Sequence, residues 1–132
     1  MRKLILATLL VAATFGTALA QDNSATNGNN NPIPNMGHAP KQPDGVGRLD
    51  LRVVDEDGNP VKGVRADLAS HRTGGFLCES WNWTDAHGVA VLPPLHMGQL
   101  TLKLSAKGYE TQKIEVNAAD LDQPVRVVMH AK

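Results

Sequence analysis

Trp81 and Trp83 are the residues whose type and spacing most directly suggest chemistry. Side chains two positions apart in an extended strand point to the same face, so the two indoles are expected to lie side by side. Neighbouring aromatic rings stack on sugars or peptides. Arg72 and Glu79 offer charged hydrogen bonds nearby, and the glycines between 73 and 76 let the loop adapt. Trp81, Trp83, Arg72 and Glu79 therefore form the candidate ligand-binding set.

The same tryptophan pair has a structural interpretation, which is our first expectation. If the turn at 85–88 closes a hairpin with Thr84 opposite Val89, Trp83 faces Ala90 and Trp81 faces Leu92. A large ring opposite a small alanine suits an interior face, and β-sandwiches commonly bury a strand tryptophan. The indoles are thus either core or platform, and a bulge between residues 74 and 83 would reverse the assignment.

No catalytic residue, metal ligand set or cofactor is predicted. The only cysteine is Cys78, and no serine lies in a Gly-flanked nucleophile elbow. The five histidines show no short zinc spacing. The acidic segment at 55–59 places Gly58 fourth and Ala66 twelfth, whereas a helix-loop-helix calcium loop needs Gly sixth and Glu twelfth. Turn formation is the interpretation we adopt for this segment, and a small hydrolase is the least expected function.

The elements that must position these side chains are β-strands. Apolar residues alternate with polar ones from residue 48 onward, and turn signals rich in Gly, Asp, Asn and Pro separate the segments. We predict a single seven-stranded antiparallel β-sandwich of two sheets. The expected strands are 49–53, 64–68, 76–84, 89–92, 100–104, 113–116 and 125–127. The expected core is Leu49, Leu51, Val53, Val64, Leu68, Leu100, Leu102, Leu104, Ile114, Val116, Val125 and Val127.

Four turn motifs in register resemble the carboxypeptidase regulatory-like domain, which has the transthyretin-like (prealbumin-like) β-sandwich fold. The motifs lie at 54–64, 84–88, 95–98 and 102–109, and the resemblance covers roughly residues 48–129. It implies a non-catalytic binding or accessory module with no shared catalytic residues to transfer. As an alternative, such a domain assembles with itself or a partner through an exposed edge strand.

The first 47 residues predict an export signal followed by a tether. Residues 1–20 combine Arg2 and Lys3 with an apolar run and a small-residue cleavage site at Ala20–Gln21, the plan of a signal peptide. Residues 21–47 contain six Asn, four Gly and four Pro, which predicts a disordered tether ahead of a domain at 48–132. Mass spectrometry of the mature protein is expected to show an N-terminus near Gln21, in the periplasm or outside the cell. An intact Met1 in a cytoplasmic fraction would contradict export.

Charge narrows the choice of partner. The chain has 13 basic and 13 acidic residues, and removal of Arg2 and Lys3 with the signal peptide leaves 11 against 13, a net charge of −2. That balance argues against nucleic acid or an anionic membrane bound through bulk charge. The expected partner is a protein or polysaccharide of the cell envelope, with weak homo-oligomerisation and no stable membrane insertion after cleavage.

Overall fold

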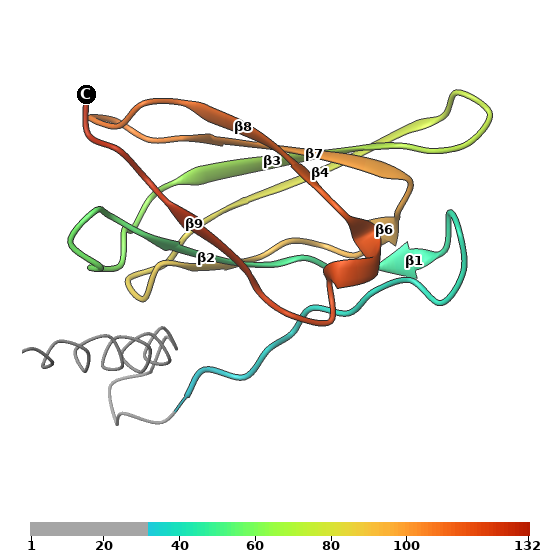
Figure 1. Ribbon diagram of the computed structural model, residues 1–132, viewed down its shortest axis with the longest axis horizontal. Helices are drawn as coiled ribbons and strands as arrows, with labels where there is room; N and C mark the ends of the chain where they lie inside the picture. The colour runs from blue at the N-terminus through green and yellow to red at the C-terminus, as the bar shows by residue number, and fades with distance from the viewer. Residues whose placement is uncertain (1–31) are drawn as a thin grey trace, which may run out of the picture.

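The computed structural model describes residues 32–132, which form two layers of β-structure (Figure 1). The predicted signal peptide, the predicted cleavage site at Ala20–Gln21 and the first part of the predicted tether lie outside the described residues. No helix among residues 32–132 is long and apolar enough to cross a membrane.

One layer is a four-stranded antiparallel sheet and the other a three-stranded sheet. The first has the strand order β4-β3-β7-β8 and the second β5-β2-β9. The first layer comprises β4 (Leu77–Trp83), β3 (Arg65–His71), β7 (Gln99–Ser105) and β8 (Gln112–Val116). The second comprises β5 (Val89–Val91), β2 (Asp50–Val54) and β9 (Val125–Val128). The all-β class predicted from the alternating pattern is therefore confirmed, in a sandwich-like arrangement.

The strand count differs from the predicted seven. Each predicted segment overlaps one strand, but β1 (Val46–Gly47) and β6 (Leu95–His96) form an additional two-stranded sheet, giving nine strands within residues 32–132. These two-residue strands are too short for an alternating pattern to reveal. A single 3-10 turn, η2 (Ala118–Asp120), joins β8 to β9.

The prediction that both sheets are wholly antiparallel is wrong for one pair. Strand β9 runs parallel to β2, with Leu51 opposite Val125 and Val53 opposite Val127. The chain leaves β8 in one layer and crosses through η2 to the edge of the other (Figure 1). A crossover between layers permits parallel pairing that a tight hairpin between neighbouring strands does not.

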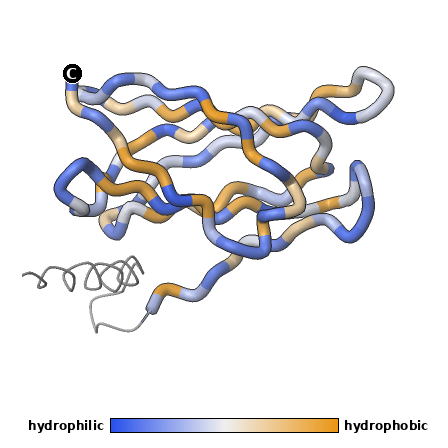
Figure 2. The backbone as a smooth tube through the Cα atoms, viewed as in Figure 1, coloured by the Kyte–Doolittle hydropathy of each residue, from blue (hydrophilic) through white to orange (hydrophobic). Residues whose placement is uncertain are grey.

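The core lies between the two layers, as the period-two pattern predicts. Nine of the twelve predicted residues are at most 7% exposed, and Ile114, Val116 and Val125 are partly buried against them. Hydrophobic stretches recur along the strands of both layers (Figure 2). Leu92, Met97, Leu121 and Met129 complete the core from loops and short elements.

Residues 33–47 correct the predicted tether, because they pack on the domain instead of hanging free. The Asp50 carboxylate accepts a hydrogen bond from the Met36 amide (2.9 Å), and the Arg52 guanidinium donates to the carbonyls of Ile33 and Pro34. His38 forms a bridge with Arg48. Backbone groups, which composition does not reveal, hold this N-terminal strap along the three-stranded layer (Figure 1).

Candidate functional site

The β3–β4 hairpin decides where the tryptophans lie. Trp83 is opposite Arg65 and Trp81 opposite Asp67 in its antiparallel register. The predicted pairing of Trp83 with Ala90 and Trp81 with Leu92 is therefore wrong. The turn at 85–88 does close, since the Asp85 amide donates to the Val89 carbonyl (3.0 Å), but β5 then pairs with β2 in the other layer.

Alternation along β3 and β4 places both indoles on the outer face of the four-stranded sheet. Ala66 and Leu68 point into the core, so Arg65 and Asp67 point outward with Trp81 and Trp83 beside them. The indoles are 50% and 48% exposed. The expectation that they are core is wrong, and the platform alternative fits their position.

The two rings form an edge-to-face pair with a cation against both. Their centroids are 5.1 Å apart and their planes make an angle of 76°. The Arg65 guanidinium carbon lies 4.7 Å from the centroid of Trp81 and 5.4 Å from that of Trp83, within cation–π range. Its Nε donates to both carboxylate oxygens of Asp67, at 3.0 and 3.1 Å. We call the charged and aromatic residues on this face the outer-face site: Arg65, Asp67, Glu79, Trp81, Trp83, Lys103 and Lys113.

A hollow of about 400 Å³ lies beside Trp81 on this face. It is lined by side chains of all four strands, with Trp81 as its aromatic wall. Trp83 does not line the hollow. The two indoles therefore differ in position: Trp81 contacts the hollow, and Trp83 packs against Trp81. The charged lining residues are Arg65, Asp67, Glu79, Lys103 and Lys113, with His71 beside them.

Of the predicted site residues, the structure brings Glu79 together with the tryptophans but not Arg72. Arg72 lies in the turn that closes the hairpin, directly after the His71–Leu77 pair. That pair is four residues from the Asp67–Trp81 pair, about 13 Å along the strand. The Arg72 guanidinium instead lies 5.7 Å from the centroid of Phe76. The arginine that lies beside the two indoles is Arg65, not Arg72.

Arg65, Asp67, Lys103 and Lys113 are the site residues that sequence reasoning missed. The sequence signal for their pairing was the Gly74–Gly75 pair, since both glycines have positive φ and permit a tight turn between residues 72 and 76, but Gly88 gives the turn at 85–88 a comparable signal. The Arg72 amide donates to the Phe76 carbonyl across it (2.7 Å). A hairpin at this turn, in place of the one at 85–88, pairs Trp83 with Arg65.

Arg72 lines a different hollow, of about 710 Å³, between the N-terminal strap and the end of β3. Asp44, which also lines it, makes two hydrogen bonds, whereas the Nε of Arg72 is buried without a hydrogen-bond partner among the described residues. Asp44 accepts from the Thr73 amide (3.3 Å), and its backbone carbonyl is 2.8 Å from the Nδ1 of His96. Hydrogen bonds from the Thr73 side chain and amide hold the pKa of Asp44 below its ordinary value. This hollow joins the strap to the domain and has no tryptophan.

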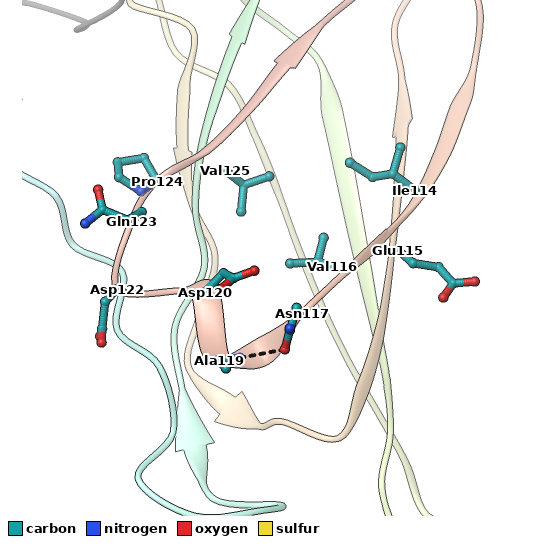
Figure 3. Close-up of a pocket in the computed structure, with 10 residues that line it drawn as sticks. All are labelled: Ile114, Glu115, Val116, Asn117, Ala119, Asp120, Asp122, Gln123, Pro124 and Val125. Carbon is teal, nitrogen blue, oxygen red and sulfur yellow. Dashed lines mark hydrogen bonds between the residues drawn. The ribbon is translucent and has the colours of Figure 1, made fainter.

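A third hollow, of about 450 Å³, opens between β8 and the η2–β9 connection (Figure 3). Ile114, Val116 and Val125 form its apolar lining. The Asp122 carboxylate there accepts from the Ala39 amide at 2.9 Å, so it holds the strap. Asn117 caps η2 by accepting from the Ala119 amide. These side chains hold the strap and cap η2, so we interpret the hollow as the open side of the sandwich and not as a ligand site.

The aspartates at the two acidic turns make hydrogen bonds within those turns. Asp55 accepts from the amides of Asp57 and Asn59, and Asp85 from those of His87 and Val89, which confirms turn formation by both. Within residues 32–132, no group of three His, Cys, Asp or Glu side chains is arranged to hold a metal. Cys78 is a partly buried free thiol on β4.

Comparison with known proteins adds information about the fold only. No protein-family model and no curated protein matches the sequence. Among solved structures, the chain is similar to 3-chlorocatechol 1,2-dioxygenase from Rhodococcus opacus 1CP, with a TM-score of 0.51 and 13% identity. The match covers 71% of this chain and spans 64% of the length of that one. At this identity, the likeness concerns the arrangement of strands.

Proposed function

We propose that the protein is a non-catalytic binding module whose ligand docks on the outer-face site. The observation that carries this proposal is the exposure of Trp81 and Trp83 on a sheet whose opposite face is the core. Paired, half-exposed indoles beside a hollow are unusual on a surface that serves solubility alone. The favoured ligand is a glycan or peptide segment, bound as an accessory function.

Binding fits the site better than catalysis does. The Ser70 hydroxyl is buried, donates to the His96 carbonyl (2.8 Å) and accepts from the Gly98 amide (2.7 Å), so it serves structure. The outer-face site offers cations, carboxylates and aromatic rings, but no serine or cysteine that a histidine activates. We therefore propose that the outer-face site binds its ligand without catalysing a reaction.

We also propose membership of the carboxypeptidase regulatory-like type, on the four turn motifs, and export to the periplasm or beyond, on the basic and apolar N-terminus. The N-terminal strap changes how the module is displayed. Because residues 33–47 pack on the domain, only the segment before them can act as a spacer. A short spacer would keep the site close to whatever anchors or accompanies the chain.

Tryptophan fluorescence tests the site. Both indoles are expected to be quenched by iodide, because each is about half exposed, and ligand is expected to protect Trp81. Aromatic stacking contributes about 0.5–1.5 kcal/mol per pair, which predicts weak binding strengthened by surface display. Trp81→Ala should lose the protection, and Trp83→Ala should weaken it less, because Trp83 does not line the hollow. Indoles that iodide cannot reach would end the proposal.

A second candidate function is assembly through the β4 edge. Within the described chain β4 pairs only with β3. Backbone hydrogen bonds join Arg72 to Phe76 and Thr84 to Val64 at the two ends of the β3–β4 ladder. Because hydrogen-bonded and non-hydrogen-bonded pairs alternate along an antiparallel ladder, the amides and carbonyls of Leu77, Glu79 and Trp81 point away from β3. Phe76 and Leu77 are 63% and 53% exposed beside this edge. Such an edge can accept another strand.

Sedimentation velocity separates the two candidates. A binding module is expected to sediment as a monomer at all concentrations without ligand. Assembly predicts a concentration-dependent dimer that Glu79→Pro abolishes, because proline cannot donate a ladder hydrogen bond. Glu115→Pro, on the edge strand β8 of the same sheet, is the matched control for any loss of folding.

A further inference from the structure

We infer that the outer-face site takes an acidic polysaccharide, with a uronic acid in the hollow beside Trp81. This inference rests on the proposed binding function and names the ligand class. The sugar ring would lie against Trp81, and its carboxylate would lie between the ammonium groups of Lys103 and Lys113. The charges around the hollow favour this class over a neutral glycan.

Lys103 and Lys113 are the first evidence. They lie directly opposite each other on β7 and β8, both exposed and both lining the hollow. Like charges in this cross-strand position destabilise a sheet. Neither ammonium group makes an ion pair within residues 32–132. A carboxylate bound between the two lysines would relieve this repulsion. The Lys103–Lys113 pair therefore destabilises the sheet without an anion and favours the binding of one.

The neighbouring acids do not supply that anion. Asp67 is the other cross-strand neighbour of Lys103, but Arg65 holds both of its carboxylate oxygens. Glu79 lies two strands from Lys103, with Ala69 opposite it on β3. The hollow is thus lined by three cations, Arg65 with the two lysines, and by two carboxylates, of which one is already paired.

The remaining lining favours a sugar over a peptide. Trp81 presents a half-exposed indole, on which the apolar face of a pyranose stacks. Thr101 and Glu79 add groups that exchange hydrogen bonds with ring hydroxyls. A volume of about 400 Å³ admits one or two sugar rings. The mature chain carries a net charge of −2, so attraction to a polyanion must come from this cluster and not from the bulk charge.

Isothermal titration of the full chain, without its signal peptide, tests the inference. The probes are oligogalacturonate and the same oligomer with its carboxyl groups reduced to alcohols. Oligogalacturonate is expected to bind at least tenfold more tightly. Lys103→Gln/Lys113→Gln and Trp81→Ala should each lose about tenfold. The matched control Lys62→Gln/Lys107→Gln removes two exposed lysines away from the hollow and should change little.

Several outcomes would overturn the inference. Equal binding of the reduced oligomer would leave the binding module standing but remove the acidic specificity. An equal loss in the Lys62/Lys107 control would assign the effect to overall charge. Binding of polyglutamate as tight as that of oligogalacturonate would indicate an acidic peptide instead. If oligogalacturonate, alginate and hyaluronate all fail while another ligand protects Trp81 from iodide, only the ligand class is wrong.

Discussion

Asp50→Ala is expected to destabilise the domain by about 3–5 kcal/mol, much of the margin of a small protein. Asp50 is fully buried and Arg52 is 5% exposed. Their bonds measure 2.7 Å from Nε to Oδ1 and 2.9 Å from a terminal guanidinium nitrogen to Oδ2. Removing the carboxylate leaves a buried guanidinium without its counter-charge and frees the Met36 amide. Urea unfolding measures the loss.

The outer-face site provides the matched control for this prediction. Arg65 and Asp67 have the same residue types at the same two-residue spacing, but their side chains are 41% and 38% exposed. Asp67→Ala is therefore expected to cost at most about 1 kcal/mol, because water screens the pair. Equal losses in Asp50→Ala and Asp67→Ala would contradict the buried pair.

A double variant separates the ion pair from the strap that it holds. Asp50→Val/Arg52→Met removes both charges together, and such replacements are often neutral for stability. This variant is expected to recover most of the stability lost in Asp50→Ala. It also removes the bonds to Ile33, Pro34 and Met36, so trypsin is expected to cleave after Lys41 faster than in the natural chain. Unchanged cleavage would show that other contacts hold the strap.

Leu102→Ala is expected to cost about 2–5 kcal/mol, the range for truncating a buried leucine. Leu102 is fully buried at the centre of the four-stranded sheet, opposite Leu68 on one side and Ile114 on the other. Strands pack from both sides, so the surroundings have little freedom to collapse into the cavity. The midpoint of urea unfolding should fall without a change in slope.

Leu77→Ala is the control for that prediction, because it removes the same atoms from a leucine that is 53% exposed on β4. Its expected cost is within about 0.5 kcal/mol, as for other surface substitutions. If Leu77→Ala costs as much as Leu102→Ala, then another surface covers the outer face in solution. That result would favour assembly through β4 over the monomeric binding module.

The N-terminal strap shows one limit of composition as a guide. Residues 33–47 contain little apolar surface, so their ordering does not follow from hydrophobic burial. They are held by backbone groups that reach Asp50, Arg52, Asp122 and Arg48. A pattern of side chains does not report where backbone amides and carbonyls find partners. The domain consequently begins before residue 48, where the alternating pattern starts.

The sequence by itself determined the seven longer strands and, for all of them except β4, which face is buried. Alternation is a local property. It places Leu49 and Leu51 on the apolar face of their segment, and Leu102 on the apolar face of β7, whichever strands lie beside them. Leu77, Glu79, Trp81 and Trp83 likewise share a face on any pairing. Alternation cannot say whether that face is the inner or the outer one.

Only the tertiary structure decided which strands pair, and the site depends on that choice. Both turns that flank β4, at 72–76 and at 85–88, have the glycines and hydrogen bonds of tight turns. Local chemistry therefore favoured neither as the hairpin. Packing of two layers decided it: β5 completes the sheet of β2, while β4 stays with β3 and turns its indoles outward to Arg65. Segments that are distant in the sequence compete to pair with the same sheet edge. Which of them pairs depends on how much apolar surface the whole fold buries.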